Sequence, residues 1–255
     1  MEKIFGSAAE AAADIADGSS ICVGGFGLCG VPIVLIDAIS SLTVRNLHVV
    51  SNNCGTDGFG LGILLADHRI SRVTASYVGE NAEFARQYLA GEVEVELTPQ
   101  GTLAERMRAG GCGIPAFYTL AGVGTLVGDG GLPWRYASDG SVAVQSPKKE
   151  QRSFNGRDYI LEESITTDYA LVRAAVADTA GNLVFHEAAR NFNPLCAMAG
   201  RVAIVEAEEI VDAGELNPDE IHLPGVFVQR VAPVPLGTEK RIEKRTVRPR
   251  LEVAS

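Results

Sequence analysis

The segment of this sequence best suited to hold a ligand through its backbone is a glycine-rich turn, Gly24-Gly25-Phe26-Gly27-Leu28-Cys29-Gly30. Residues 25–30 satisfy the pattern G-x-G-x-x-G, in which glycines let backbone N–H groups approach a phosphate at a helix N-terminus. The turn follows a short apolar run and precedes Pro32, a residue favoured at the first position of a helix. The hexapeptide alone is compatible with a dinucleotide site or with a purely structural turn.

The end of the next predicted strand weakens the dinucleotide hypothesis. Such a site needs an Asp or Glu about 20 residues beyond the glycines to bind the ribose hydroxyls. Here the strand at 47–50 ends in Ser51, Asn52 and Asn53, which offer amides instead. Gln100 follows a second predicted strand at 93–97. Because open α/β sheets bind ligands at the carboxyl ends of their strands, these amides become candidate ligand contacts, with ordinary turn chemistry as the alternative.

The elements that would position these residues follow an α/β pattern. The order strand, glycine turn, helix, strand over residues 20–50 predicts a parallel sheet. We expect one helix that begins at a Ser7-x-x-Glu10 cap and ends at about Gly18, and a second over 83–89 that Asn81 could cap. A third is expected to begin at a Thr102-x-x-Glu105 cap and to end at Gly111. Further strands are expected at 202–206 and 226–228.

Residues 128–163 have a different character. Strands are expected at 142–144 and 159–161, with Asn155-Gly156 as a hairpin signal. The predicted fold is therefore an open, mostly parallel sheet flanked by helices, with a β-rich excursion. We expect one domain over 1–235 and a charged, solvated tail over 236–255.

Composition excludes several classes of protein. A net charge of −10 argues against nucleic-acid binding. Two uncharged stretches, 18–36 and 109–128, contain glycines and proline, so no membrane span is expected, and no signal peptide precedes them. The four histidines have no metal-site spacing, and the five cysteines form no C-x-x-C pair, so we expect reduced thiols, no metal and a cytoplasmic location. The cysteines are Cys22, Cys29, Cys54, Cys112 and Cys196.

Read at greater length, the turn belongs to a longer signature. Residues 17–32 carry Asp-Gly, a short apolar strand, Gly-Gly-Phe and Gly-x-Pro, a spacing that closely resembles the N-terminal signature of the family I coenzyme A transferases. Segments 50–55, 77–81, 96–106, 113–119 and 189–194 resemble the same family, so the likeness extends to about Val231. Within the family the match is to the α-type subunit of succinyl-CoA:3-oxoacid CoA-transferases.

The resemblance implies two homologous subunits that meet around the active site and a ping-pong reaction on an acyl-CoA thioester, with no permanently bound cofactor. A glutamate attacks the thioester, and CoA passes through covalent intermediates to a second carboxylic acid. It also implies that Asn52, Asn53 and Gln100 contact the acyl or carboxylate group, and that the glycine turn lies beside CoA. Succinyl-CoA and a 3-oxo acid such as acetoacetate are the expected pair. The alternatives are a 3-oxoadipate or acetate CoA-transferase, a nicotinamide-dependent dehydrogenase, or a ligand-binding domain without catalysis.

One expected motif is missing. The family's nucleophilic glutamate lies in a Ser-Glu-Asn-Gly motif of the β subunit, which this sequence does not contain. Its nearest fragment is Gly79-Glu80-Asn81, where Glu80 precedes a predicted helix and is interpreted as structural. We therefore expect no catalytic nucleophile in this chain and a β-subunit partner, by resemblance in an α₂β₂ assembly. At Phe185-His186-Glu187-Ala188 the sequence departs from the family's more basic, threonine-containing stretch.

Overall fold

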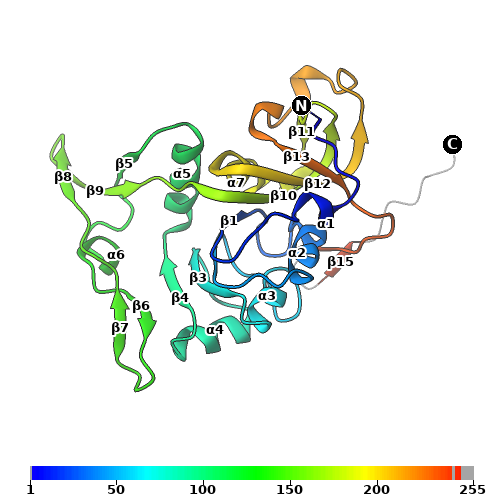
Figure 1. Ribbon diagram of the computed structural model, residues 1–255. Helices are drawn as coiled ribbons and strands as arrows, with labels where there is room; N and C mark the ends of the chain where they lie inside the picture. The colour runs from blue at the N-terminus through cyan, green and yellow to red at the C-terminus, as the bar shows by residue number, and fades with distance from the viewer. Residues whose placement is uncertain (1, 243–244, 248–255) are drawn as a thin grey trace.

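A parallel β-sheet forms the centre of the computed structural model, which describes residues 2–242 and 245–247 (Figure 1). Its strand order is β13-β12-β10-β1-β2-β3-β4, and every neighbouring pair in this path is parallel. A short strand, β11 (Leu183–Val184), pairs antiparallel with β10. The strands of the path are β1 (Ser20–Val23), β2 (Leu47–Ser51), β3 (Ile70–Ala75), β4 (Glu94–Leu97), β10 (Thr167–Asp178), β12 (Gly200–Val211) and β13 (Arg230–Pro233).

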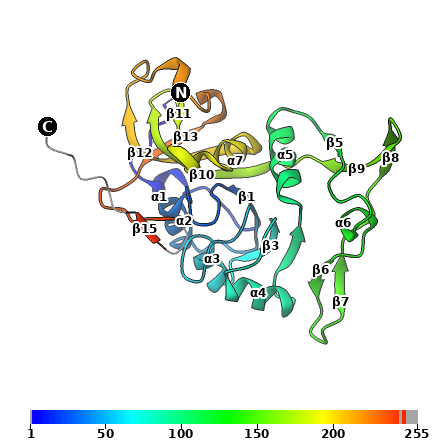
Figure 2. The ribbon, with the colours of Figure 1, turned by 180° about the vertical axis from the view of Figure 1, so that it is seen from behind.

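Helices cover both faces of this sheet (Figures 1 and 2). One layer contains α1 (Ala8–Ala11), α2 (Ile33–Ser40), α3 (Gly62–Ala66) and α4 (Ala82–Leu89); the other contains α5 (Gln100–Gly111) and α7 (Asn193–Ala199). Along β1, Ile21 and Val23 pack in the first layer and Cys22 in the second, as the alternation of a strand requires. The predicted α/β fold with an open, mostly parallel sheet is confirmed.

The β-rich excursion is an arm that extends from the body (Figures 1 and 2). It contains a three-stranded sheet, β5-β9-β8, and a two-stranded sheet, β6-β7, with a short helix α6 (Leu126–Asp129) between them. Asn155 and Gly156, with φ of 50° and 74°, form the predicted hairpin turn between β8 and β9. The strands are β5 (Ala116–Thr119), β6 (Pro133–Tyr136), β7 (Val142–Gln145), β8 (Gln151–Phe154) and β9 (Arg157–Glu163).

Three local expectations differ from the structure. Helix α1 ends at Ala11, well before Gly18, because the chain turns there and Asp14 and Asp17 bind Arg230 and the backbone N–H of Arg45. Helix α5 begins at Gln100, directly after Pro99, so Thr102 is buried within the first turn and does not cap it. Residues 226–228 are not a strand.

The apolar run at 226–228 is too short to show the hydrophobic periodicity that distinguishes a strand from a helix. Residues Gly225–Phe227 form a 3₁₀ helix, and the strand at the sheet edge is β13 instead. Two other 3₁₀ turns occupy Glu187–Arg190 and Pro218–Glu220. The cap at Asn81 is confirmed, since its side-chain oxygen accepts a hydrogen bond from the N–H of Phe84 at 2.8 Å.

The predicted tail is only partly covered by the structure. β14 (Lys240–Ile242) and β15 (Arg245–Val247) form an antiparallel pair, and Lys240 forms an ion pair with Glu208. Residues 243–244 and 248–255 lie outside the described residues, so the boundary at 235 stays a prediction. No helix in the described part of the chain is long and apolar enough to span a bilayer.

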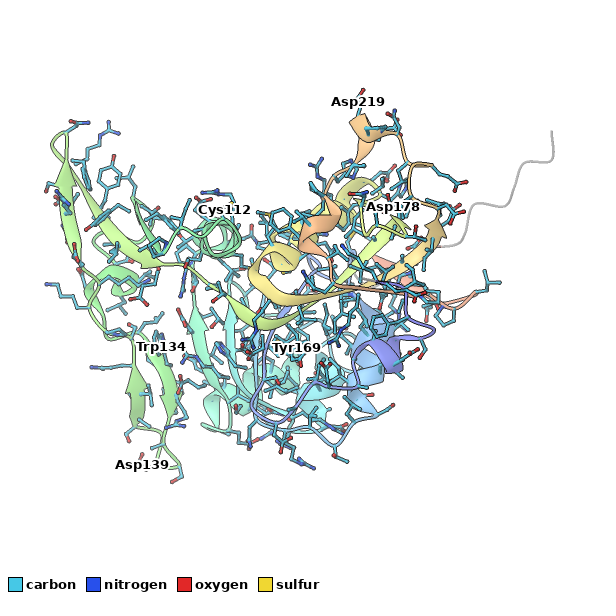
Figure 3. All side chains as sticks on the ribbon, turned by 45° about the horizontal axis from the view of Figure 1, so that its top comes forward. Cys112, Trp134, Asp139, Tyr169, Asp178 and Asp219 are labelled. Atoms are coloured by element: carbon cyan, nitrogen blue, oxygen red, sulfur yellow. The ribbon has the colours of Figure 1, made fainter. Side chains whose placement is uncertain are left out.

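An ion-pair network fastens the arm to the sheet. On β4, Glu96 accepts hydrogen bonds from Arg106 Nη1 at 2.6 Å and from Arg72 Nη2 at 2.8 Å. Arg106 Nε also lies 3.9 Å from Glu162 on the arm, a side chain that pairs with Lys149. Burial alone would raise the pKa of Glu96, but Arg106 and Arg72 outweigh it and hold that pKa below its usual range. Trp134, labelled on the arm in Figure 3, lies under the Arg72 guanidinium at 5.3 Å.

Replacing Arg106 by Met should destabilise the protein by about 1.5 to 3 kcal/mol, because it removes the cation shared by the partly buried Glu96 and the buried Glu162, although Arg72 and Lys149 remain beside them. The matched control is Arg108→Met on the same helix, where the pair with Glu105 is exposed on both sides. That variant should lose less than about 1 kcal/mol. Urea unfolding of both variants measures the difference, and equal losses would contradict the role assigned to the network.

Candidate functional site

The carboxyl edge of the sheet brings Asn52 and Gln100 together. Asn52 follows β2, and Gln100 is the first residue of α5, three positions after β4 ends. The Gln100 Nε2 group donates to Asn52 Oδ1 at 2.8 Å, and Ser76 Oγ donates to the same oxygen at 2.9 Å. Both acceptor positions of the Asn52 carbonyl are thereby used, so its N–H₂ group is the part of this amide left to serve a ligand.

Asn53, which lies beyond the end of β2, has a different set of neighbours. Together with Gly24, Gly27 and Ser51, it lines a small cavity of about 10 Å³, roughly the room for one water molecule. The three amides predicted from sequence are thus at one edge but in two settings. Asn52 and Gln100 form a pair, and Asn53 lies against the glycine turn.

The glycine turn is a tight loop between β1 and α2. Phe26 and Cys29 exchange two backbone hydrogen bonds of 3.0 Å, and Gly25, Gly27 and Gly30 have positive φ. Gly24 is needed for a different reason, since a Cβ there would lie 2.0 Å from Asn193 Oδ1. Leu28 is buried, and Phe26 at the tip is 47% exposed.

A segment distant in sequence holds this turn in place. Asn191 Nδ2 donates to Cys29 O at 3.1 Å, and Asn193 Nδ2 donates to Gly30 O at 3.0 Å. Phe192 between them stacks on Phe26 with ring centroids 6.4 Å apart. The sequence identifies residues 189–194 only as part of the family signature, and no local pattern predicts these contacts.

The N-terminus of α2 is already occupied by a carboxylate of this chain. Glu206 on β12 is completely buried, and its Oε2 accepts a hydrogen bond from the N–H of Leu35 at 2.9 Å. Its Oε1 pairs with Arg173 Nη1 at 2.9 Å. Burial raises the pKa of the Glu206 carboxyl to about 7, against the opposing effects of Arg173 and the N–H groups of Leu35 and Val34. Sequence patterns give no sign of this contact, which spans 171 positions.

Other titratable residues near this edge are less buried than Glu206. Cys29 is half-buried, and burial together with nearby Glu187 raises the pKa of its thiol. Glu80 is exposed at a left-handed φ of 66°, directly before the Asn81 cap. His186 and Glu187, where the sequence departs from the family pattern, are exposed. Within residues 2–242 and 245–247, no group of three His, Cys, Asp or Glu side chains could hold a metal ion.

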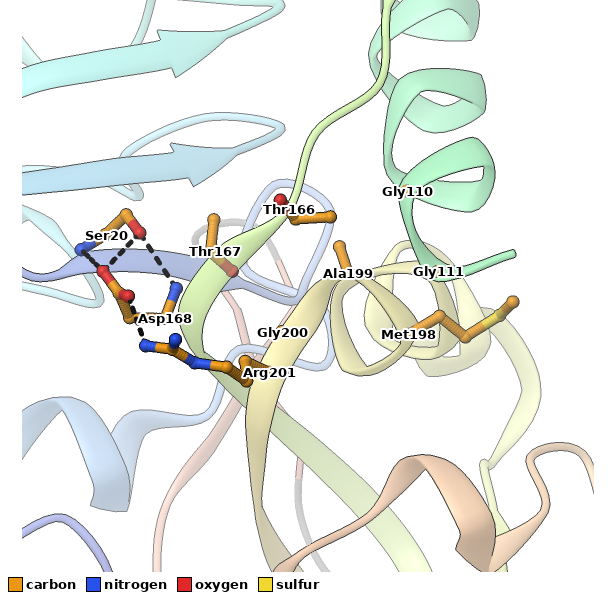
Figure 4. Close-up of a pocket in the computed structure, with 10 residues that line it drawn as sticks. All are labelled: Ser20, Gly110, Gly111, Thr166, Thr167, Asp168, Met198, Ala199, Gly200 and Arg201. Carbon is orange, nitrogen blue, oxygen red and sulfur yellow. Dashed lines mark hydrogen bonds and ion pairs between the residues drawn. The ribbon is translucent and has the colours of Figure 1, made fainter. Parts of the chain in front are cut away.

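A second groove lies at the opposite edge of the sheet. Its volume is about 410 Å³, and it is lined by the first residues of three strands, Ser20, Thr167 and Gly200 (Figure 4). Asp168 closes one side, accepting from Ser20 Oγ at 2.7 Å and pairing with Arg201 at 2.8 Å. The amides predicted as ligand contacts are all at the other end of the strands, so this groove is separate from them.

Comparison with known proteins defines the class. The sequence profile described as "Coenzyme A transferase" matches residues 5–233. The chain belongs to the coenzyme A transferase family of enzymes.

Relatives of high identity point to one type of subunit. Over 248 residues the chain is 62% identical to the A-type subunit of the probable succinyl-CoA:3-ketoacid coenzyme A transferase of Mycobacterium tuberculosis, covering 97% of this chain and 100% of that one. It is 54% identical over 248 residues to the A-type subunit of the Helicobacter pylori enzyme, covering 97% and 99%. The chain is therefore similar to the A-type subunit of these transferases, as its sequence motifs indicated.

Solved structures support the fold. An acyl-CoA transferase of Escherichia coli O157:H7, in a thioester complex with CoA, superposes with a TM-score of 0.78 at 21% identity. That match covers 96% of this chain but only 50% of the other, so this chain spans about half its length. Glutaconate coenzyme A-transferase of Acidaminococcus fermentans gives a TM-score of 0.75 at 20% identity, covering 91% and 76%.

Replacing Gly24 by Ala should destabilise the protein by about 3 kcal/mol, because the added Cβ displaces Asn193 Oδ1, which accepts from the N–H of Arg173 at 3.0 Å. Gly27→Ala is the matched control in the same turn, since a Cβ there meets nothing within 4 Å. Its cost should be about 1 kcal/mol, from the positive φ alone. Thermal unfolding compares the two variants, and a larger loss in Gly27→Ala would refute this account of the turn.

Proposed function

We propose that this chain is the α subunit of a heteromeric 3-oxoacid CoA-transferase. In this proposal it helps move CoA from succinyl-CoA to a 3-oxo acid such as acetoacetate. A β subunit supplies the nucleophilic glutamate in a Ser-Glu-Asn-Gly motif, and the subunits assemble as α₂β₂ in the cytoplasm. Support comes from the A-type relatives and from the sequence itself, which lacks that motif.

The observation that carries the proposal is the pair of amides at the carboxyl edge, Asn52 and Gln100. When a carboxylate attacks a thioester carbonyl, negative charge develops on the carbonyl oxygen, and fixed N–H donors stabilise it. The Gln100 amide is held by Asn52, which is itself held by Ser76. Such a chain of hydrogen bonds orients a donor before the substrate arrives.

In the proposed reaction the partner's glutamate adds to the acyl carbonyl, and the tetrahedral oxyanion collapses with loss of the CoA thiolate. The thiolate then attacks the glutamyl carbonyl of the resulting anhydride, which releases succinate and leaves a glutamyl-CoA thioester. The 3-oxo acid carboxylate attacks this thioester, which releases the CoA thiolate and forms a second acyl-glutamyl anhydride. The thiolate then attacks the new acyl carbonyl, which gives the product acyl-CoA and frees the glutamate carboxylate. Each addition develops an oxyanion, and Gln100 with Asn52 is the proposed donor group for it.

The glycine turn, residues 24–30, is proposed to lie along CoA in the same site, with Asn53 behind it. A 3-oxoadipate-preferring or acetate-preferring transferase remains the second candidate, because selectivity depends on a pocket shared with the partner. The dehydrogenase hypothesis has lost its support, since the chain belongs to the transferase family and a carboxylate already occupies the N-terminus of α2.

Reconstitution tests the proposal directly. The chain is expressed alone and together with a β-type partner that carries Ser-Glu-Asn-Gly, and exchange between succinyl-CoA and acetoacetate is followed. We expect activity only in the mixture, and loss of that activity when the partner's motif glutamate is changed to glutamine. Absence of exchange between any short acyl-CoA and carboxylate in the assembled complex would sink the proposal.

Within the active complex, Gln100→Ala should lower kcat by about 10²-fold with little change in KM for succinyl-CoA, because the lost donor acts on the developing oxyanion. Gln145→Ala, an exposed glutamine on the arm, is the control and should leave kcat unchanged. If Gln100→Ala raised KM at constant kcat, the residue would bind the ground state and its oxyanion role would be wrong.

A further inference from the structure

We infer that Glu206 is a positioning residue for the glycine turn, acting as a built-in anion at the N-terminus of α2. This inference rests on the proposed function for its catalytic consequence, but its structural part concerns the chain alone. In glycine-turn folds, the first-turn N–H groups of the following helix form an anion site for a ligand phosphate. Here a side chain of the protein takes that place.

The first contact of Glu206 is to the helix. Leu35 is the third residue of α2, and its N–H donates to Glu206 Oε2 at 2.9 Å, within a carboxyl that is completely buried. No side chain caps α2 from its own N-cap residue, Pro32. The carboxylate therefore satisfies a first-turn donor and meets the positive end of the helix.

The second contact leads back to the turn by another route. Glu206 Oε1 pairs with Arg173 Nη1, and the backbone N–H of Arg173 donates to Asn193 Oδ1 at 3.0 Å. Asn193 in turn donates to Gly30 O at 3.0 Å. One route from Glu206 thus reaches Leu35 directly, and the other reaches Gly30 through Arg173 and Asn193. These two chains of hydrogen bonds end at the two ends of the short segment from Gly30 to Leu35. They therefore hold the end of the glycine turn in place.

Two acceptor oxygens on the Glu206 side chain are needed for this geometry. Both carboxylate oxygens accept from N–H donors, whereas a glutamine has one acceptor oxygen and one N–H₂ group. In Glu206→Gln, the N–H₂ group must therefore face either Leu35 N–H or Arg173 Nη1, and one of the two routes breaks. Arg173, only 6% exposed, would then keep one fewer partner for a buried cation.

Cys29 is a probe of the turn that does not depend on catalysis. Cys22, Cys54 and Cys196 are buried, and Cys112 is exposed, so in a Cys112→Ser background Cys29 is the thiol that reagents reach first. The rate of its alkylation by iodoacetamide is measured in the full-length chain. We expect Glu206→Gln to raise that rate several-fold, because a loosened turn exposes the half-buried thiol.

Glu208→Gln is the matched control. Glu208 Oε1 also accepts from Arg173, through Nε at 3.1 Å, but its hydrogen-bond partners are Arg173 and Lys240, and neither belongs to α2. Its variant should leave the Cys29 rate as in the parent. An unchanged rate in Glu206→Gln, or the same increase in both variants, would overturn the inference.

A conservative variant covers the case in which Glu206→Gln does not fold. Glu206→Asp keeps the charge but is one methylene shorter, so it cannot reach Leu35 N–H and Arg173 together. It should raise the Cys29 rate to a smaller extent, and a parent-like rate in this variant would count against the inference in the same way.

The catalytic consequence is measured in the complex with the β-type partner. At an assay temperature below the unfolding temperature of the variant, Glu206→Gln should lower kcat about tenfold. Glu208→Gln should have the kcat of the parent. A complex that is inactive even with the parent chain would refute the proposed function, while the Cys29 rates would still decide the role of Glu206. A Glu206→Gln complex with parent kcat and a raised Cys29 rate would show that the turn's position does not matter for catalysis and would overturn the catalytic part.

Discussion

Where the parallel strands end, the backbone leaves the sheet while still largely covered by protein, and its polar groups must find partners there. Side chains from other parts of the chain supply them. Asn191 and Asn193 bind the carbonyls of Cys29 and Gly30, and Asn81 Nδ2 binds Cys54 O at 3.0 Å. Ser51 Oγ binds Val23 O at 2.9 Å. These short polar side chains therefore help to set the shape of the carboxyl edge of the sheet.

The amides predicted as ligand contacts are uncharged. Glu206 and Arg173 form a buried ion pair, whereas Asn52 and Gln100 are neutral, although Glu80 and Glu187 are exposed nearby. A pair of neutral donors suits a reaction in which negative charge appears briefly on an oxygen, because a permanent cation would also bind the anionic substrate in its ground state. The nucleophile expected from the partner would then complete a site whose donors are already set.

The elements predicted correctly were those with a local signal. Ser20–Val23 is a short apolar run between turns, Asn81 precedes a helix it can cap, and Asn155-Gly156 requires the left-handed backbone of a tight hairpin. The strand expected at 226–228 was wrong because three apolar residues do not define a period. Asn52 and Gln100 were predicted to share an edge, and they do, although the direct hydrogen bond between them could not be foreseen. The roles of Asn193 and Glu206 had no local signal, since their partners are 163 and 171 positions away.

The separation of Glu206 and Leu35 along the sequence also bears on how the protein folds. Contacts between residues so far apart raise the contact order and form late, because a long loop must close before they stabilise anything. During synthesis the first βαβ unit leaves the ribosome long before β12 does. The nascent glycine turn therefore lacks its contacts with Glu206 and Asn193 until roughly the last quarter of the chain has been made and has packed against the sheet. The glycine turn is thus among the last parts of the molecule to reach its final form, although its residues are among the first to be made.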